Sequence, residues 1–362
     1  MKRLIWAGLA GLALLLVITA WWLYRSSSAG APAEGAVAAS TFSLAILGDS
    51  DSHSYHDRVS FPASHAQRGG AFHDITWQWG EVLSQLRRPA IDLGPWGRTG
   101  TWWPVALVQD KLGWGGRAPV KEDFQYNFAQ SGVGCDALIK GRMADRLVRV
   151  MDQEPARWTR GAVVIRIGIN DFGTQEALQA LSVNPGDPAV VGTMDHCLGQ
   201  IQQAVALIHG HHPKAGIVLV GMFDNSHWAR WTHLWRSKSE KDNIAHGLDH
   251  FDQALRELAS KDRRLAFFDD RAWFDRQWGG RDEQGQPAYR PLKLGARYEV
   301  LNTEGDHPSH TTLADGHAGL VWNLLWAQSL VKLLNQSFDA RLAEVSDAEL
   351  VQWLDKHTAG RW

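Results

Sequence analysis

Short apolar runs alternate with longer amphipathic stretches along most of this chain. The apolar runs are rich in β-branched and aromatic residues, and they predict strands at 41–47, 124–129, 161–168, 215–223 and 264–269. Apolar positions at helical spacing predict helices at about 74–87, 136–153, 174–182, 193–210, 241–261 and 311–336. This alternation is typical of a mainly parallel sheet with helices on its faces. A last helix is predicted in "SDAELVQWLDKHTAG", where Ser346 and Glu349 have the spacing of a capping box.

The N-terminal segment has a different pattern. Residues 1–25 hold two basic residues and then 21 uncharged, mostly apolar positions from Leu4 to Tyr24. A helix of that length is roughly 31 Å long, enough to span a bilayer. We expect a membrane anchor with a cytoplasmic N-terminus, and a cleaved signal peptide is the alternative. Either would place the rest of the chain on the extracytoplasmic, periplasmic side of a cell membrane.

The segment at 26–40 is rich in small residues and has no periodic apolar pattern, so it is interpreted as a flexible linker. We expect the main domain to span 41–336 and the C-terminal helical tail to span 337–362. A chain of 362 residues with 44% hydrophobic residues can fill a sizeable core. A formal net charge of -2 provides no field that would attract nucleic acid.

Tryptophan and cysteine usage adds two open questions. Several of the 19 Trp lie in Gly- and Pro-containing stretches such as "GPWGRTGTWWP" and "LGWGGRAP". They could form an aromatic surface for sugars or acyl chains, although core packing and loop contacts are the favoured interpretation. Cys135 and Cys197 could pair in an oxidising compartment or remain as two buried thiols.

Small and polar residues follow the predicted strands. Gly48, Asp49 and Ser50 follow the first, "NFAQSG" ends at Gly132, and "GIND" contains Asn170. Ligands of an open parallel sheet bind beyond the carboxyl ends of its strands. A hydroxyl, an imidazole, a carboxylate and oxyanion donors are the groups a serine hydrolase needs, and the chain offers all four.

The order of these motifs resembles the SGNH (GDSL) hydrolase family over about 41–336. The resemblance implies a three-layer α/β/α sandwich of the flavodoxin-like type, with ester hydrolysis and no cofactor. It implies that Ser50 is the nucleophile. It also implies that the Ser50 N–H, the Gly132 N–H and the Asn170 side-chain amide form the oxyanion hole.

The late Asp/His block departs from the family pattern of an Asp three residues before a His-Pro. Asp315-Gly316-His317 has the carboxylate two residues away and no Pro, but it directly precedes the last predicted helix. His307-Pro308 has the Pro, with Glu304 three residues before it and Asp306 adjacent. We assign Asp315 and His317 as the catalytic pair and keep His307, with Asp306 or Glu304, as the alternative.

The other titratable residues near these motifs are expected to have mainly structural roles. Asp49 and Asp171 are expected to bind loop amides. His53, His56 and Asp57 either line the site entrance or satisfy one another in an ordered loop, and the loop interpretation is favoured. The "HGHHP" sequence at 209–213 is expected to end a helix.

The sequence predicts an extracytoplasmic, membrane-anchored esterase that acts through an acyl-enzyme on an acyl or acetyl group of a glycan or lipid. Hydrolysis and acyl transfer remain alternatives, because both proceed from the same intermediate. A metal-dependent phosphoesterase is a second interpretation, in which Asp51-Ser52-His53 is a metal motif and Asp49, His56 and the late His residues are further ligands. A third is an inactive Trp-rich carbohydrate-binding protein.

Overall fold

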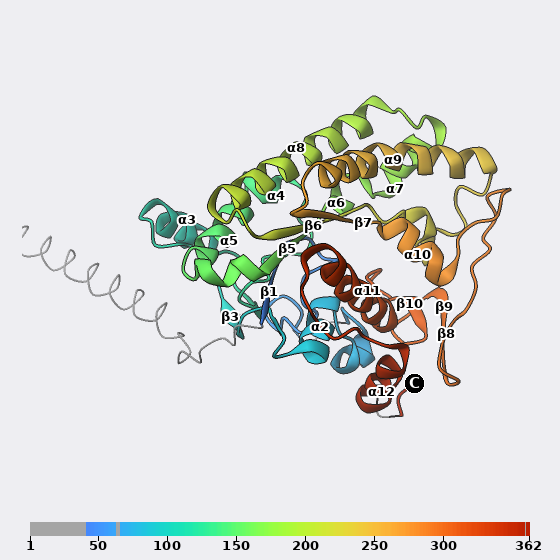
Figure 1. The fold of residues 1–362 in the computed structure, drawn as a ribbon. Helices are drawn as coiled ribbons and strands as arrows, with labels where there is room; N and C mark the ends of the chain where they lie inside the picture. Colours follow the sequence, from blue (N-terminus) through green and yellow to red (C-terminus); the bar gives the residue numbers. More distant parts are fainter. Residues whose placement is uncertain (1–40, 63–65, 359) are drawn as a thin grey trace, which may run out of the picture. The chain divides into compact units, whose positions relative to one another are not determined.

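The computed structural model of this protein describes residues 41–62, 66–358 and 360–362 (Figure 1). The predicted anchor at 1–25 and the linker at 26–40 lie outside these residues. Within the described part of the chain, none of the helices combines the length and the apolar character needed to cross a membrane.

A five-stranded sheet forms the centre of the described domain. Its strands are β1 (Phe42–Gly48), β2 (Ile91–Asp92), β5 (Gly161–Arg166), β6 (Gly216–Val220) and β7 (Leu265–Phe268). They are arranged β2-β1-β5-β6-β7, and every neighbouring pair is parallel. In chain order this arrangement is 2-1-3-4-5, the flavodoxin-like order. The predicted α/β fold is confirmed.

Helices cover both faces of this sheet (Figure 1). One face is covered by α2 (Trp79–Arg87), α10 (Asp270–Trp278), α11 (Leu320–Phe338) and α12 (Asp347–Thr358). The other is covered by α4 (Asp136–Ile139), α5 (Met143–Met151), α6 (Ile169–Phe172), α7 (Gln175–Val183), α8 (Pro188–His211) and α9 (Lys238–Lys261). α8 ends within the His-rich sequence at 209–213, as expected.

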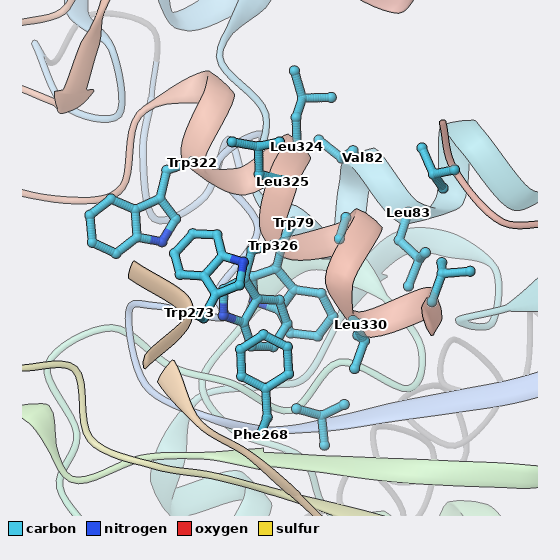
Figure 2. Packing of buried hydrophobic residues seen from close by; sticks show 14 of the residues in the cluster. Trp79, Val82, Leu83, Phe268, Trp273, Trp322, Leu324, Leu325, Trp326 and Leu330 are labelled. Carbon is cyan, nitrogen blue, oxygen red and sulfur yellow. The ribbon is translucent and has the colours of Figure 1, made fainter. Parts of the chain in front are cut away.

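Two hydrophobic cores fill the space between sheet and helices because each buried strand sends alternate side chains to opposite faces. In β1, Leu44 and Ile46 belong to one core and Ala45 and Leu47 to the other. Figure 2 shows the first core, where the Trp326 ring lies 4.7 Å from the ring of Phe268, measured between centroids.

Many tryptophans are buried in the core, as the favoured interpretation expected, but three neighbouring ones are exposed. The side chains of Trp79, Trp158, Trp273, Trp278 and Trp326 are less than 2% exposed. In contrast, Trp102, Trp103 and Trp114 are 72%, 50% and 53% exposed. These three form the exposed Trp segment, on and beside α3 (Trp103–Lys111).

The prediction of a strand at 124–129 is wrong, because the observed strand ends at Phe124. β4 (Lys121–Phe124) pairs antiparallel with β3 (Trp96–Thr99), outside the central sheet. The following residues run along β1, with Ile46 N–H donating to Tyr126 O (2.9 Å) and Phe128 N–H donating to Ile46 O (2.8 Å). Because β2 pairs only with the first two residues of β1, the rest of that edge is available to this run.

Three predicted helices have different limits. The helix at 136–153 is divided into α4 and α5 around Arg142, whose φ of 62° is incompatible with a continuous helix. The helix expected at 74–87 begins at Trp79, after the 3₁₀ turn η1 (Gly70–Ile75). The helix expected at 311–336 begins at Leu320, because β10 (His310–Thr312) precedes it and pairs with β9 (Tyr298–Glu304).

The remaining elements are short. They are β8 (Leu292–Leu294), which pairs with β9, and the 3₁₀ turns η2 (Pro155–Arg160), η3 (Asn225–His227) and η4 (Ala229–Trp231).

Candidate active site

The turn that carries Ser50 begins where β1 meets β5. A Cβ on Gly48 would lie 2.5 Å from the carbonyl oxygen of Arg166, so this close contact between strands accepts only glycine. Ser50 follows two residues later and is 7% exposed. Its hydroxyl forms no hydrogen bond to another described residue, and neither does its N–H.

The carbonyl oxygen of Asp51 fixes the conformation of this turn. It accepts hydrogen bonds from Gln78 Nε2 (2.8 Å), Trp79 Nε1 (3.0 Å) and Arg166 Nη1 (3.0 Å). Asp49 Oδ1 accepts the Asp51 N–H at 3.0 Å, which confirms the expected loop-binding role of Asp49. Burial, followed by the nearby charge of Asp51, raises the pKa of the Asp49 carboxyl well above its ordinary value.

The turn rests on a buried ion pair. Arg166 Nη2 lies 2.9 Å from Asp270 Oδ2, and the side chains are 7% and 1% exposed. Trp326 Nε1 donates to the other carboxylate oxygen at 2.9 Å. Since Arg166 also binds the Asp51 carbonyl, this pair connects β5 and α10 to the turn that carries Ser50.

The segment that ends at Gly132 lies beside the end of β1. Gln130 N–H donates to Gly48 O at 3.0 Å, and Gly132 follows at an exposed position with a φ of 79°. A Cβ at Gly132 would meet no atom within 4 Å, so glycine is favoured here by backbone conformation rather than by space. The Gly132 N–H donates to no described residue.

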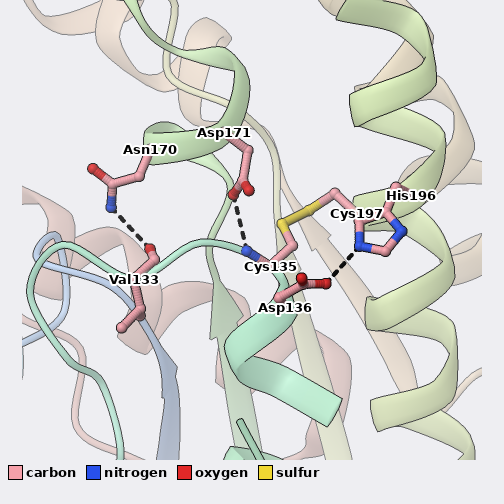
Figure 3. The surroundings of a disulfide bond; sticks show 7 residues. All are labelled: Val133, Cys135, Asp136, Asn170, Asp171, His196 and Cys197. Carbon is pink, nitrogen blue, oxygen red and sulfur yellow. Dashed lines mark hydrogen bonds and ion pairs between the residues drawn. A yellow bond between two sulfur atoms is a disulfide. The ribbon is translucent and has the colours of Figure 1, made fainter. Parts of the chain in front are cut away.

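Asn170 and Asp171 connect the end of β5 to the Gly132 segment (Figure 3). Asn170 Nδ2 donates to Val133 O at 2.9 Å, and Asp171 Oδ2 accepts the Cys135 N–H at 2.9 Å. The expected amide-binding role of Asp171 is confirmed. The Asn170 amide therefore lies at the Gly132 segment, although its donor is engaged with a carbonyl oxygen.

The two cysteines form a disulfide that holds the same segment to α8 (Figure 3). Cys135 and Cys197 have a Cα–Cα distance of 5.2 Å, and both side chains are fully buried. Of the two possibilities left open by the sequence, the paired one is found.

Replacing both cysteines by alanine is expected to lower the free energy of unfolding by about 4 kcal/mol, because the bridge closes a long loop in the unfolded chain. The sequence separation of the pair is 62 residues. Urea unfolding of the wild type and of the Cys135→Ala/Cys197→Ala variant, each with and without reductant, measures this effect. Reductant should destabilise the wild type alone. Equal stability of the oxidised wild type and the variant would contradict the prediction.

Asp315 and His317 form the imidazole–carboxylate pair predicted from the sequence. His317 Nδ1 lies 3.1 Å from Asp315 Oδ1, and the side chains are 23% and 17% exposed. Both residues lie in the loop between β10 and α11. Burial opposes the charge on Asp315, but the contacts from His317 and Arg68 outweigh it and hold the pKa of this carboxyl below its ordinary value.

Arg68 is a site residue that the sequence does not reveal. Its Nη1 lies 2.6 Å from Asp315 Oδ2 and 2.5 Å from His317 Nδ1, and its Nη2 donates to Ser131 Oγ at 3.2 Å. The guanidinium also stacks on Phe61, with Cζ 4.3 Å from the ring centroid. Arg68 thus joins the Asp315–His317 pair to the residue before Gly132.

His317 Nδ1 contacts both Arg68 and Asp315, but it can form only one of these two hydrogen bonds at a time. A guanidinium can only donate, so its contact requires a lone pair on Nδ1, whereas the Asp315 contact requires a proton there. A general base that accepts through Nε2 needs the second arrangement. Arg68 can retain its bond to Asp315 Oδ2 in either one.

The alternative base His307 lacks a carboxylate partner among the described residues. Its Nδ1 contacts Ser309 Oγ at 2.8 Å. The two acidic residues considered with it have other partners, since Asp306 accepts the Ala314 N–H and Glu304 pairs with Arg230. The structure therefore forms the pair with His317 and not the one with His307.

The histidines of the opening loop satisfy neighbouring groups, as the favoured interpretation expected. His53 Nε2 lies 2.8 Å from Asp57 Oδ2, and His56 Nδ1 lies 3.0 Å from Glu81 Oε1. Among the described residues, no group of three or more His, Cys, Asp or Glu side chains is arranged to hold a metal ion. The metal ligands considered from the sequence do not converge.

The structure brings the predicted residues together in two groups. Asn170 contacts the residue after Gly132, and His317 contacts Asp315. Ser50 lies on the turn that follows β1 and has no hydrogen bond to His317. Ser131 is also missing from the sequence-based site, although its position directly before Gly132 could have suggested it.

No family model matches this sequence, and no curated protein matches it. A protein described as a GDSL-like lipase from Parabacteroides merdae is 14% identical, with 83% of this chain and 96% of that chain covered and a TM-score of 0.39. An extracellular lipase from Streptomyces rimosus is 15% identical, with 79% and 99% covered and a TM-score of 0.38. Phospholipase A1 from Streptomyces albidoflavus is 12% identical, with 79% and 99% covered and a TM-score of 0.31. These values are too low to transfer an activity or a substrate.

Proposed function

We propose that this protein is an extracytoplasmic serine esterase that hydrolyses a carboxylic ester through an acyl-enzyme. The observation that carries the proposal is the set of unpaired groups at the carboxyl edge of the sheet. The Ser50 hydroxyl, the Ser50 N–H and the Gly132 N–H bind no described residue, and an imidazole–carboxylate pair lies in the adjoining loop.

In the proposed reaction Ser50 Oγ attacks the ester carbonyl carbon, and its proton passes to His317 Nε2. Asp315 stabilises the imidazolium through Nδ1–H, and Arg68 keeps that carboxylate ionised. The free N–H groups of Ser50 and Gly132 donate to the developing oxyanion. Asn170 becomes the third donor when its amide leaves the Val133 carbonyl. Water then attacks the acyl-enzyme and regenerates Ser50.

The substrate proposed is an acyl or acetyl ester on an envelope glycan or lipid. The exposed Trp segment supports it, because flat aromatic side chains bind sugars and acyl chains. Arg117, which follows Trp114 closely in the sequence, donates through Nη1 to Gln125 O at 2.7 Å, in the run of residues that leads to Gly132. Transfer of the acyl group to a sugar hydroxyl is the other outcome open to the same intermediate.

The cellular location is proposed from the sequence. The apolar segment at 1–25 supports attachment to the cell membrane by a single helix, with the catalytic domain on the periplasmic side. The Cys135–Cys197 disulfide agrees with an oxidising compartment.

A series of p-nitrophenyl esters of increasing acyl length tests the proposed reaction. We expect a first-turnover burst of nitrophenol, steady hydrolysis that chelators do not reduce, and an organophosphonate adduct on the peptide that contains Ser50. Absence of hydrolysis with every ester would contradict an esterase. Loss of activity with a chelator and recovery with added metal would instead favour a metal-dependent hydrolase.

A further inference from the structure

A second hydroxyl–imidazole–carboxylate chain lies beside the proposed site. Ser131 Oγ is 3.0 Å from His53 Nδ1, and His53 Nε2 is 2.8 Å from Asp57 Oδ2. Ser50 has no comparable hydrogen bond in the structure. The second chain uses none of the residues Ser50, Asp315 and His317.

The hydrogen bonds around His53 select one tautomer. The Ser131 N–H also donates to His53 Nδ1, at 3.2 Å, so Nδ1 carries a lone pair and Nε2 carries the proton given to Asp57. Burial, with the charge of Lys121 next in importance, lowers the pKa of His53. His53 is therefore a proton acceptor directed at the Ser131 hydroxyl.

The environment of Asp57 supports the same arrangement. Asp57 is fully buried, yet the hydrogen bonds from His53 and from Ser60 outweigh burial and lower the pKa of its carboxyl. A carboxylate that remains ionised can stabilise an imidazolium on its neighbour.

Arg68 adds a cation to the Ser131 hydroxyl. Its Nη2 donates to Ser131 Oγ at 3.2 Å, which favours the alkoxide over the alcohol. Ser131 is partly exposed, whereas His53 is 2% exposed. An ester can therefore reach the hydroxyl, while water has little access to the buried base.

We propose that Ser131 is a second covalent acyl acceptor, activated by His53 and Asp57, which retains an acyl group as a long-lived ester. The inference rests on the proposed function only for the substrate class, a carboxylic ester. The Oγ–carbon bond forms while the hydroxyl proton moves to His53 Nδ1. When the tetrahedral intermediate collapses, the bond to the leaving alcohol breaks and that proton passes to the leaving oxygen.

Acetylation of the full-length Ser50→Ala protein by p-nitrophenyl acetate tests the proposal. We expect about one equivalent of nitrophenol, little turnover, and one acetyl group mapped by mass spectrometry to Ser131. Ser50→Ala/Ser131→Ala should take up no acetyl group. Adding His53→Gln to Ser50→Ala should slow acetylation on the order of 100-fold.

The matched control is Ser309, whose hydroxyl contacts His307 Nδ1 at 2.8 Å in an imidazole without a carboxylate partner among the described residues. Ser50→Ala/Ser309→Ala should be acetylated at the rate of Ser50→Ala. This arm separates the complete chain of three groups from a simple hydroxyl–imidazole contact.

The outcomes distinguish this inference from the proposed function. Turnover by the wild type with no acetyl group on Ser131 in Ser50→Ala would overturn the inference and leave the esterase proposal intact. Acetyl-Ser131 together with full turnover in Ser50→Ala would support the inference and overturn Ser50 as nucleophile. Absence of both reactions in the wild type would overturn both. The Ser50→Ala substitution does not alter the hydrogen bonds of Ser131. Mapping the acetyl group in this variant therefore does not require a protein changed at Ser131, His53 or Asp57 to fold correctly.

Discussion

Replacing Ser50 by alanine is expected to lower kcat/KM for an ester substrate by about 10⁴-fold or more, with the fold retained. The substitution removes only an oxygen that binds no described residue, while the surrounding turn keeps the three hydrogen bonds to the Asp51 carbonyl. Steady-state kinetics, with circular dichroism to confirm folding, measure the effect.

Ser52 is the matched control for this substitution. It lies on the same turn, is fully buried, and its hydroxyl has no hydrogen-bond partner among the described residues. Ser52→Ala should retain activity close to that of the wild type. If Ser50→Ala kept more than about a tenth of the wild-type activity, Ser50 would not be the main nucleophile.

Replacing Asp270 by alanine is expected to lower the free energy of unfolding by about 3–5 kcal/mol. The change removes the close carboxylate partner of the buried Arg166 guanidinium and leaves only the longer contact to Asp51 Oδ2 at 3.8 Å, and a poorly paired buried charge is costly. Activity should fall as well, because Arg166 donates to the Asp51 carbonyl beside Ser50, the proposed nucleophile. Chemical unfolding at neutral pH and ester kinetics measure the two effects.

Two further variants test whether the loss of stability in Asp270→Ala comes from the buried charge of Arg166. Asp270→Ala/Arg166→Met should recover much of the lost stability, because the poorly paired buried charge is then absent. Glu257→Gln, in the exposed pair with Lys261 at 3.7 Å, should leave stability unchanged. Equal stability of Asp270→Ala and the wild type would show that the buried pair does not support the turn that carries Ser50.

The central strands could be predicted because their evidence is local. β5, β6 and β7 are buried along their whole length or nearly so, and such strands appear in a sequence as continuous apolar runs. β2 has only two residues, and the pairing of 126–128 with Ile46 depends on how far β2 extends along β1. The length of an apolar run contains no information on either point.

Some residues of the candidate site could also be predicted from the sequence, and others could not. Ser50, Gly132 and Asn170 follow strand-like runs, so the shared polarity of a parallel sheet predicts that they lie at one edge. Arg68 lies in a long loop without periodicity, 247 residues before Asp315 along the chain. Its contact with Asp315 exists only after that loop has folded against the segment before α11.

The sequence by itself determined the alternation of strands and helices, the order of the polar motifs at the strand ends and the Asp315–His317 spacing. These are properties of neighbouring residues, governed by periodicity and by short-range backbone preferences. Only the tertiary structure decided that Cys135 pairs with Cys197, that Arg68 joins Asp315 to Ser131, and that His53 is directed at Ser131. Each of these contacts joins distant parts of the chain, and it forms only when packing of the two cores has fixed where the loops lie.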